Sequence, residues 1–157
     1  MKEILAKIHA QLTNRGKTIA TAESCTGGLL AAALTDAAGS SKFFVGGIIA
    51  YANAIKLAEL AVPDDVLGKF GAVSKEVVLL MAENVRVKFD TDFALATTGI
   101  AGPEGGSSEK PVGTVWVAFA SRKKSHATLL HLKGDRASIR QQTVSEIFKE
   151  LLGLLEQ

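Results

Sequence analysis

The segment TIATAESCTGG, from Thr18 to Gly28, decides how the rest of the chain is organised. Its first residues are apolar and β-branched, which predicts a short buried strand over 18–22. The apolar residues of Cys25 to Ala37 recur at helical spacing, so we expect the strand to pass into a helix directly at Ser24. A serine at such a junction lies beside unpaired backbone amides at the positive end of a helix dipole. The segment therefore predicts an anion or oxyanion site at Ser24.

The remainder of the chain repeats this alternation of strands and helices. Further helices are expected over 2–14 and 54–60, after the cap Ser74 and after the cap Asp135, and further strands over 43–51, 93–98, 112–120 and 125–132. The first three strands are expected to run parallel, and a hairpin turn at Ser121 to Lys124 makes the fourth antiparallel. The predicted fold class is α/β, a three-layer α/β/α sandwich with a mixed five-stranded sheet, in one domain over residues 1–157.

The composition is typical of one globular domain with a large core. Of 157 residues, 47% are hydrophobic, and the mean hydropathy is +0.22. A net charge of +2 gives no basis for a polyelectrolyte contact with nucleic acid. The single cysteine, the lack of a signal peptide and the lack of a long apolar run predict a cytoplasmic protein. The sequence contains no metal-ligand cluster, P-loop or dinucleotide motif, so we expect neither a metal nor a cofactor.

Four connections are expected to leave the same edge of the sheet. They follow the first, second, third and fifth strands, at Ser24, Asn53, Gly99 and Asp135. Ligands of open α/β sheets bind at this carboxyl edge. Asn53 is expected to cap a helix, which puts Lys56 in the first turn, where the helix dipole and partial burial disfavour the charged amine. A lysine with a lowered pKa is a suitable general base for Ser24.

Simpler interpretations stay open for both residues. Ser24 is an ordinary helix N-cap if it has no base, and a lone lysine such as Lys56 is commonly solvated. Cys25 competes as the nucleophile, because a helix N-terminus lowers the pKa of a thiol. A Ser-His-Asp triad is disfavoured, because the three histidines lie in the first helix and on opposite sides of the last strand.

Four sequence strings occur together in this chain. They are TAESCTGG at 21–28, YANAIK at 51–56, GIAGPEGG with KPVGTVW between 99 and 116, and GDR at 134–136. Together they resemble the CinA C-terminal-domain family, the competence/damage-inducible protein family whose stand-alone members are nicotinamide-nucleotide amidohydrolases. The resemblance covers nearly the whole chain and is to the stand-alone form, because larger members carry an N-terminal molybdopterin-binding-like domain. Ala52 departs from the pattern, which usually has serine after the tyrosine.

The resemblance implies hydrolysis of nicotinamide mononucleotide to nicotinate mononucleotide and ammonia, in pyridine-nucleotide salvage. It also implies a Ser-Lys pair, and the matching positions are Ser24 and Lys56, which the sheet edge indicates independently. Tyr51 is expected to hydrogen-bond Lys56 or to relay its proton. We expect the following residues to bind the substrate: Cys25, Thr26, Gly27, Gly28, Thr97, Thr98, Gly102, Gly105, Gly106, Arg136 and Arg140.

The two arginines are the expected phosphate ligands. Arg140 lies on the inward-facing stripe of the last helix and is the first choice, and Arg136 in its first turn is the second. A structural salt bridge is the alternative for Arg140. The alternative for the whole chain is a non-catalytic nucleotide-binding or competence- and DNA-damage-associated module. We also expect a homo-oligomer with the apolar stretch 57–62 as its contact, and no nucleic-acid or membrane partner.

Overall fold

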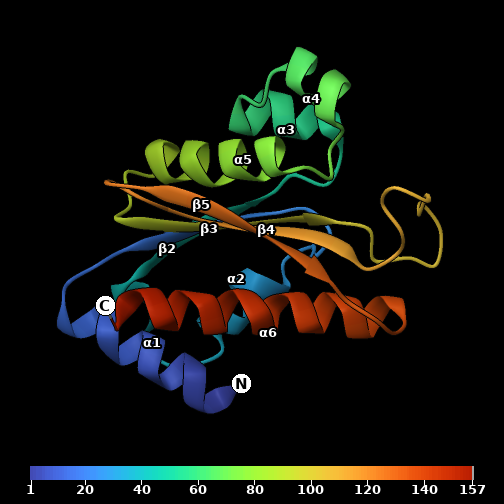
Figure 1. Ribbon diagram of the computed structural model, residues 1–157. Coiled ribbons are helices and arrows are strands. Elements are labelled where there is room, and N and C mark those ends of the chain that lie inside the picture. Colours follow the sequence, from blue (N-terminus) through green and yellow to red (C-terminus); the bar gives the residue numbers. More distant parts are fainter. Residues whose placement is uncertain (157) are drawn as a thin grey trace.

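The computed structural model describes residues 1–156 (Figure 1). The helices are α1 (Lys2–Asn14), α2 (Leu29–Thr35), α3 (Asn53–Leu60), α4 (Asp64–Phe70), α5 (Lys75–Lys88) and α6 (Arg136–Leu155), with a short 3-10 helix, η1, at Ser40–Lys42. The strands are β1 (Ile19–Glu23), β2 (Phe44–Ile49), β3 (Phe93–Gly99), β4 (Thr114–Ser121) and β5 (Ser125–His131). The order of strands and helices agrees with the prediction from sequence.

The five strands form one mixed sheet in the order β2-β1-β3-β4-β5. β1 pairs in parallel with β2 and β3, and β4 is antiparallel to both of its neighbours. Ala22 of β1 lies beside Ile48 of β2 and Ala96 of β3, so β1 is the middle strand of the parallel half. The predicted topology is therefore confirmed, and the carboxyl ends of β1, β2 and β3 meet at one edge of the sheet.

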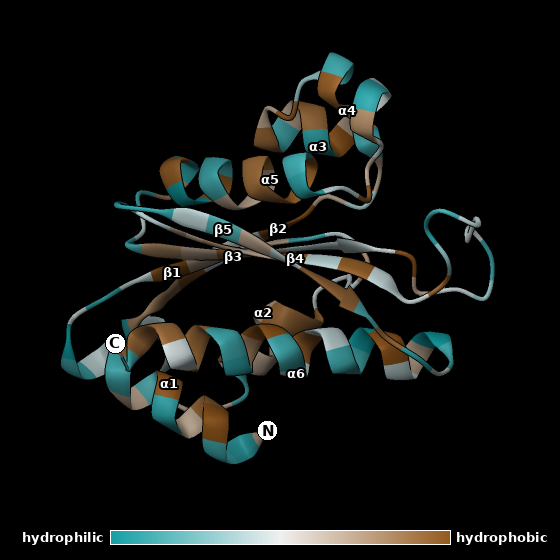
Figure 2. Cartoon of the chain, in the orientation of Figure 1, coloured by the Kyte–Doolittle hydropathy of each residue, from teal (hydrophilic) through white to brown (hydrophobic). Residues whose placement is uncertain are grey.

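Helices cover both faces of the sheet. Figure 1 shows α5 on one face with α3 and α4 beyond it, and α2 and α6 on the other face with α1 packed against α6. Ile19 belongs to the core beneath α6, whereas Ala20 and Ala22 belong to the core beneath α5. β1 is buried along its whole length because both of its faces are covered, which explains its uninterrupted run of residues without charge before Glu23. Hydrophobic residues concentrate accordingly on the strands and on the helix surfaces toward them (Figure 2).

The helix after β1 begins later than the sequence predicts. α2 starts at Leu29 rather than at Cys25, because Gly27 and Gly28 have φ values of +59° and +104°. An α-helix requires negative φ, and glycine is the residue that adopts these positive values at little cost. Residues 24–28 therefore form a turn between β1 and α2 rather than a first helical turn.

The start of α3 also differs from the prediction. Its N-cap is Ala52, which has no capping side chain, and Asn53 is the first helical residue. The predicted N-cap role of Asn53 is therefore wrong. Lys56 still lies in the first turn, because its backbone N–H donates to the Ala52 carbonyl at 3.1 Å. The predicted caps of α5 and α6, Ser74 and Asp135, are confirmed, since each accepts a backbone hydrogen bond at the helix start.

The apolar stretch 57–62 is not an exposed surface. Leu60 and Val62 are buried in the core beneath α5, and Leu57 is exposed. The expectation of an exposed subunit contact along this stretch is therefore wrong for its buried members. Exposed apolar side chains are found instead on β2, at Val45 and Ile49. Within residues 1–156, no helix is long and apolar enough to span a membrane.

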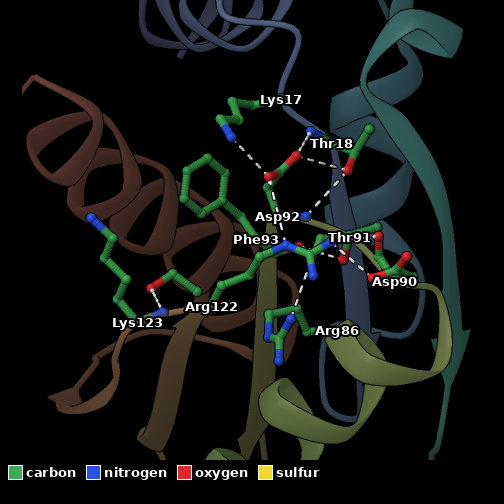
Figure 3. A network of polar contacts seen from close by, with 10 residues as sticks. Lys17, Thr18, Arg86, Asp90, Thr91, Asp92, Phe93, Arg122 and Lys123 are labelled. Atoms are coloured by element: carbon green, nitrogen blue, oxygen red, sulfur yellow. Dashed lines mark hydrogen bonds and ion pairs between the residues drawn. The ribbon is translucent and has the colours of Figure 1, made fainter.

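A network of charged residues joins the opposite, amino-terminal edge of the parallel strands (Figure 3). The Asp92 carboxylate accepts hydrogen bonds from Lys17 Nζ at 2.9 Å and from the Thr18 amide at 3.0 Å. Arg122 lies 3.9 Å from the same carboxylate and 2.8 Å from that of Asp90. Partial burial raises the pKa of Asp92, but the hydrogen bonds from Thr18 and Lys17 outweigh it, so the pKa is lowered overall. These contacts tie the residues before β1 to the residues before β3.

Candidate active site

Ser24 and Lys56 meet at the carboxyl edge of the sheet. Ser24 directly follows β1, where its amide donates to the Thr97 carbonyl at 3.0 Å and extends the ladder with β3. Lys56 projects from the first turn of α3, and its Nζ lies 3.0 Å from Ser24 Oγ. Ser24 is 9% exposed and Lys56 is 1% exposed. The two residues that the sequence analysis paired are therefore in hydrogen-bond contact in a site largely closed to water.

The amine of Lys56 is surrounded by oxygens that bear no formal charge. Besides Ser24 Oγ, it contacts the carbonyls of Ala50 at 2.8 Å and Tyr51 at 3.0 Å. Among residues 1–156, no carboxylate lies within salt-bridge distance of it. Burial lowers the pKa of Lys56 below its ordinary value, and Cys25 opposes this shift. The site therefore favours the neutral amine more than the surface of a protein does.

Glu23, which the sequence analysis did not identify, performs the capping that was attributed to Ser24. It is the last residue of β1, and its carboxylate accepts hydrogen bonds from the amides of Gly28, Leu30 and Ala31 at 2.8–3.0 Å. These amides lie at the start of α2, whose N-cap, Gly28, has no side chain. The interpretation of Ser24 as an ordinary N-cap is therefore wrong. The signal in the sequence was a carboxylate at the end of an otherwise uncharged buried strand.

The amides that follow Ser24 are used unequally. The Gly27 amide donates to the Ser24 carbonyl at 3.1 Å and is not free for a ligand. In the described part of the chain, the amides of Cys25 and Thr26 have no hydrogen-bond acceptor. Thr26 is fully buried, whereas Cys25 is 5% exposed. The Cys25 amide, directly after Ser24, is therefore the best placed donor for a developing oxyanion.

The Cys25 thiol is a poor nucleophile in this position. Burial raises its pKa to about 11, with a further contribution from the nearby Glu23 carboxylate. The protonated thiol is the dominant form at neutral pH, and the thiolate is the reactive one. The three histidines are elsewhere: His9 packs on Phe43, His126 pairs with Glu150, and the last lies at the end of β5. The structure thus brings neither a reactive thiol nor a histidine base to Ser24.

Tyr51 and Arg136 form the exposed side of the site. Tyr51 is 57% exposed, and its hydroxyl accepts a hydrogen bond from Arg136 at 2.7 Å. Tyr51 contacts Lys56 through its backbone carbonyl, so its hydroxyl is committed to the arginine instead of the lysine. Arg136 also donates to the Gly102 carbonyl at 2.8 Å. Arg136 is exposed and bridges the end of β2 and the loop after β3, two segments that border Ser24 and Lys56.

Arg140 is one turn further along α6 and has a different environment. Its guanidinium donates to the carbonyls of Cys25 at 3.1 Å and Thr26 at 2.8 Å, and it is partly buried. No carboxylate among residues 1–156 pairs with it, so the alternative of a structural salt bridge is wrong. Arg140 instead holds the turn that contains the predicted nucleophile.

The remaining predicted substrate residues divide into buried and exposed groups. The Thr97 hydroxyl contacts that of Thr26 at 2.8 Å, and the Thr98 hydroxyl donates to the Ala72 carbonyl at 2.8 Å. Both threonines are fully buried, so they support the site from inside. Gly105 and Gly106 are exposed in the loop after β3, which projects from the domain in Figure 1.

Comparison with known proteins agrees with this arrangement. The CinA C-terminal domain family matches residues 1–155. The chain belongs to this family. A CinA-like protein of Cytophaga hutchinsonii is 46% identical over 146 residues, which are 93% of this chain and 34% of that protein. The chain spans about a third of the length of the curated relatives that it matches.

Solved structures of CinA proteins have the same fold. The competence/damage inducible protein CihA of Agrobacterium tumefaciens is 40% identical, with a TM-score of 0.95 over 99% of this chain and 95% of that one. The competence damage-inducible protein A of Klebsiella pneumoniae is 34% identical, also with a TM-score of 0.95, over 99% and 96% of the two chains. The resemblance inferred from the four sequence strings is thereby confirmed at the level of family and fold.

This CinA domain presents the groups that acyl transfer needs. A hydroxyl is in contact with an amine of lowered pKa, and a backbone amide without an acceptor follows the hydroxyl. An exposed arginine lies at the same rim. A nucleophile, a base, an oxyanion donor and an anion ligand are thus available within one small region.

Proposed function

We propose that this domain hydrolyses nicotinamide mononucleotide to nicotinate mononucleotide and ammonia through an ester at Ser24. The observation that supports this most is the 3.0 Å contact between Lys56 Nζ and Ser24 Oγ, with both side chains buried and no carboxylate near the amine in residues 1–156. The substrate follows from the resemblance to nicotinamide-nucleotide amidohydrolases. Family membership and the fold agree with that resemblance but do not identify a substrate.

The oxygens around Lys56 suit a neutral amine. A neutral amine has two N–H donors and one lone pair, whereas an ammonium has three donors and none. The carbonyls of Ala50 and Tyr51 can accept only, so they take the two N–H groups. The lone pair is then directed to Ser24, whose hydroxyl is the one neighbour able to donate among the three contacts. In this form Lys56 is prepared to take the serine proton.

The reaction follows from this arrangement. Lys56 takes the Ser24 proton while Oγ bonds to the carboxamide carbon, and the Cys25 amide stabilises the oxyanion. The C–N bond then breaks, and the leaving nitrogen takes the proton from Lys56 to depart as ammonia. Lys56, neutral again, removes a proton from water as water attacks the ester. Cleavage of the C–Oγ bond returns that proton to Ser24 and releases the acid.

The arginines take different tasks in this scheme. Arg136 is exposed and makes only neutral hydrogen bonds, which a phosphate exchanges for stronger charge-assisted ones. Arg140 already uses two of its nitrogens to hold the turn after Ser24. We therefore assign the phosphate to Arg136 and a supporting role to Arg140, reversing the order of preference from sequence.

An ammonia-release assay on nicotinamide mononucleotide tests the proposal. We expect turnover by the wild type, and a loss of about 10⁴-fold or more in kcat for Ser24→Ala and for Lys56→Ala, with both variants folded by circular dichroism. Substantial ammonia release by either folded variant would refute the dyad. Binding of the nucleotide by the wild type without any ammonia release would instead favour a non-catalytic nucleotide-binding module.

A further inference from the structure

Glu23 is a buried carboxylate that the proposed chemistry does not consume. It is 1% exposed, and its oxygens accept four hydrogen bonds. The donors are the Thr26 hydroxyl at 2.7 Å, the amides of Gly28 and Leu30 at 3.0 Å, and the amide of Ala31 at 2.8 Å. Among residues 1–156, no lysine, arginine or histidine forms an ion pair with it. The carboxylate is therefore compensated by neutral donors from the turn after Ser24 and the start of α2.

Burying a carboxylate without a cation is costly unless its oxygens are fully hydrogen-bonded. A capping Ser or Asp at the helix start would satisfy the amides of α2 without a group that spans the turn. Glu23 instead reaches over the turn from the strand side, since it precedes Ser24 while its partners follow Ser24. The carboxylate thus closes a ring around residues 24–28 and fixes the distance between the end of β1 and the start of α2.

Arg140 holds the same turn through its carbonyls. It donates to the carbonyls of Cys25 and Thr26, while Glu23 receives the Thr26 hydroxyl and the following amides. The peptides on either side of Thr26 are trans, so each amide N–H points away from the carbonyl that faces Arg140. The Gly27 amide follows this rule and donates to the Ser24 carbonyl. The turn is therefore fixed by an anion from β1 and a cation from α6, which do not pair with each other.

We propose that Glu23 is a positioning residue for the nucleophile. Its carboxylate fixes the turn so that Ser24 Oγ meets Lys56 and the Cys25 amide keeps its place beside the reacting carbon, without itself contacting the substrate. Loss of the carboxylate then lowers the rate of acyl transfer and leaves substrate binding at the rim unchanged. This inference rests on the proposed amidase function, and it extends that function to a residue outside the dyad.

The test compares Glu23→Gln with the wild type and with Ser74→Ala. Glutamine keeps the size but replaces one acceptor oxygen by an NH₂ group, which has to face an N–H donor. We expect kcat for ammonia release to fall about 30- to 100-fold and KM to stay within about twofold. Ser74→Ala removes another helix cap, that of α5 on the opposite face of the sheet, and we expect its kcat to match the wild type at a comparable loss of thermal stability.

A second readout separates this inference from the choice of substrate. A fluorophosphonate reacts with activated serines, so its rate of attachment to Ser24, mapped by peptide mass spectrometry, reports on the nucleophile alone. We expect Glu23→Gln to slow this labelling by a similar factor, even if nicotinamide mononucleotide is not hydrolysed. A folded Glu23→Gln with kcat and labelling rate within about threefold of the wild type overturns the inference, as does a wild type that is not labelled at Ser24.

Thr26→Val provides the decision if Glu23→Gln does not fold. Valine keeps the shape of Thr26 and removes the hydroxyl that bridges Glu23 and Thr97. We expect kcat or the labelling rate to fall about tenfold with KM unchanged, because one of the four donors to the carboxylate is lost. Wild-type values for both rates in this variant overturn the inference.

Discussion

Two lysines of this chain lie at opposite edges of the sheet and have opposite surroundings. Lys17, at the amino-terminal edge, is 44% exposed in its side chain and pairs with the Asp92 carboxylate at 2.9 Å. Lys56, at the carboxyl edge, is almost fully buried and contacts a hydroxyl and two carbonyls. The first arrangement favours a permanent charge, and the second disfavours it.

The difference separates a structural ion pair from a chemical site. At the Lys17 edge every charged group has an opposite charge within reach, so the network lowers the pKa of Asp92 and joins β1 to β3 (Figure 3). At the Lys56 edge the nearest carboxylate in the sequence, Glu23, is occupied by four neutral donors. An amine without a counter-ion beside a hydroxyl is expensive for folding, and its retention is best explained by a base that must lose its proton.

The largest effect is expected from changing the kind of cation at each edge. Lys56→Arg keeps the positive charge but removes the ability to become neutral, so we expect kcat for ammonia release to fall about 10³-fold or more. Lys17→Arg is the matched control, and we expect its kcat to equal the wild-type value, because an arginine also pairs with Asp92. Steady-state ammonia release measures both. A Lys56→Arg enzyme with near-wild-type kcat would contradict the neutral base.

The pH dependence of the reaction sharpens the same contrast. Only the neutral form of Lys56 is active in our scheme, so kcat/KM should rise about tenfold per pH unit until the pKa of Lys56 is reached. Burial lowers that pKa, so the plateau should begin below the ordinary value of 10.5. The measurement is kcat/KM against pH, with Lys17→Arg as a control that leaves the profile unchanged. A rising limb that continues to 10.5 would exclude a lowered pKa.

The two arginines of α6 extend the comparison to the substrate. Arg136→Gln removes an exposed cation, so we expect KM for nicotinamide mononucleotide to rise about 10- to 100-fold with little change in kcat. Nicotinamide riboside lacks the phosphate and should show no such rise. Arg140→Gln removes the support of the turn after Ser24 and should lower kcat on both compounds instead. Equal effects of Arg136→Gln on both compounds would count against its assignment to the phosphate.

The smallest effect is expected at the structural edge. Asp92→Asn removes a carboxylate that two hydrogen bonds hold, so we expect the free energy of unfolding to fall by about 1–2 kcal/mol at neutral pH. The folded pKa of Asp92 is below its ordinary 3.8, so its stabilisation is present above that pH and is lost as the pH falls through the folded value. Urea unfolding at neutral and strongly acidic pH measures this. A difference from the wild type that persists in acid, or a reduced kcat, would disagree with a purely structural network.

The fold and the dyad were predictable because their signals are local. Alternating apolar segments gave the order of strands, and short connections between them fixed which chain turns share an edge. Ser24 and Lys56 each follow a parallel strand closely, so topology alone brings them together. The relation between the side chains did not have to be known in advance.

The turn after Ser24 was less predictable because its contacts are distant in sequence. Arg140 reaches Cys25 from more than a hundred residues further along the chain, and no local pattern announces that partner. Gly27 and Gly28 were visible, but whether they continue a helix or interrupt it depends on φ, and their positive values displace the helix start to Leu29. That displacement leaves room for Glu23 to cap α2, which is why its role appeared only in the structure.

The most direct test of the account is the titration of the Lys56 amine itself. Nitrogen-15 NMR of the labelled folded protein, with the Lys56 resonance assigned by its absence in Lys56→Arg, reports the protonation state at each pH. We predict that Lys56 loses its proton well below 10.5 and below the titration of Lys17, because burial without a counter-ion disfavours the ammonium. A Lys56 amine that stays protonated up to its ordinary value would contradict the central claim of a neutral base at Ser24.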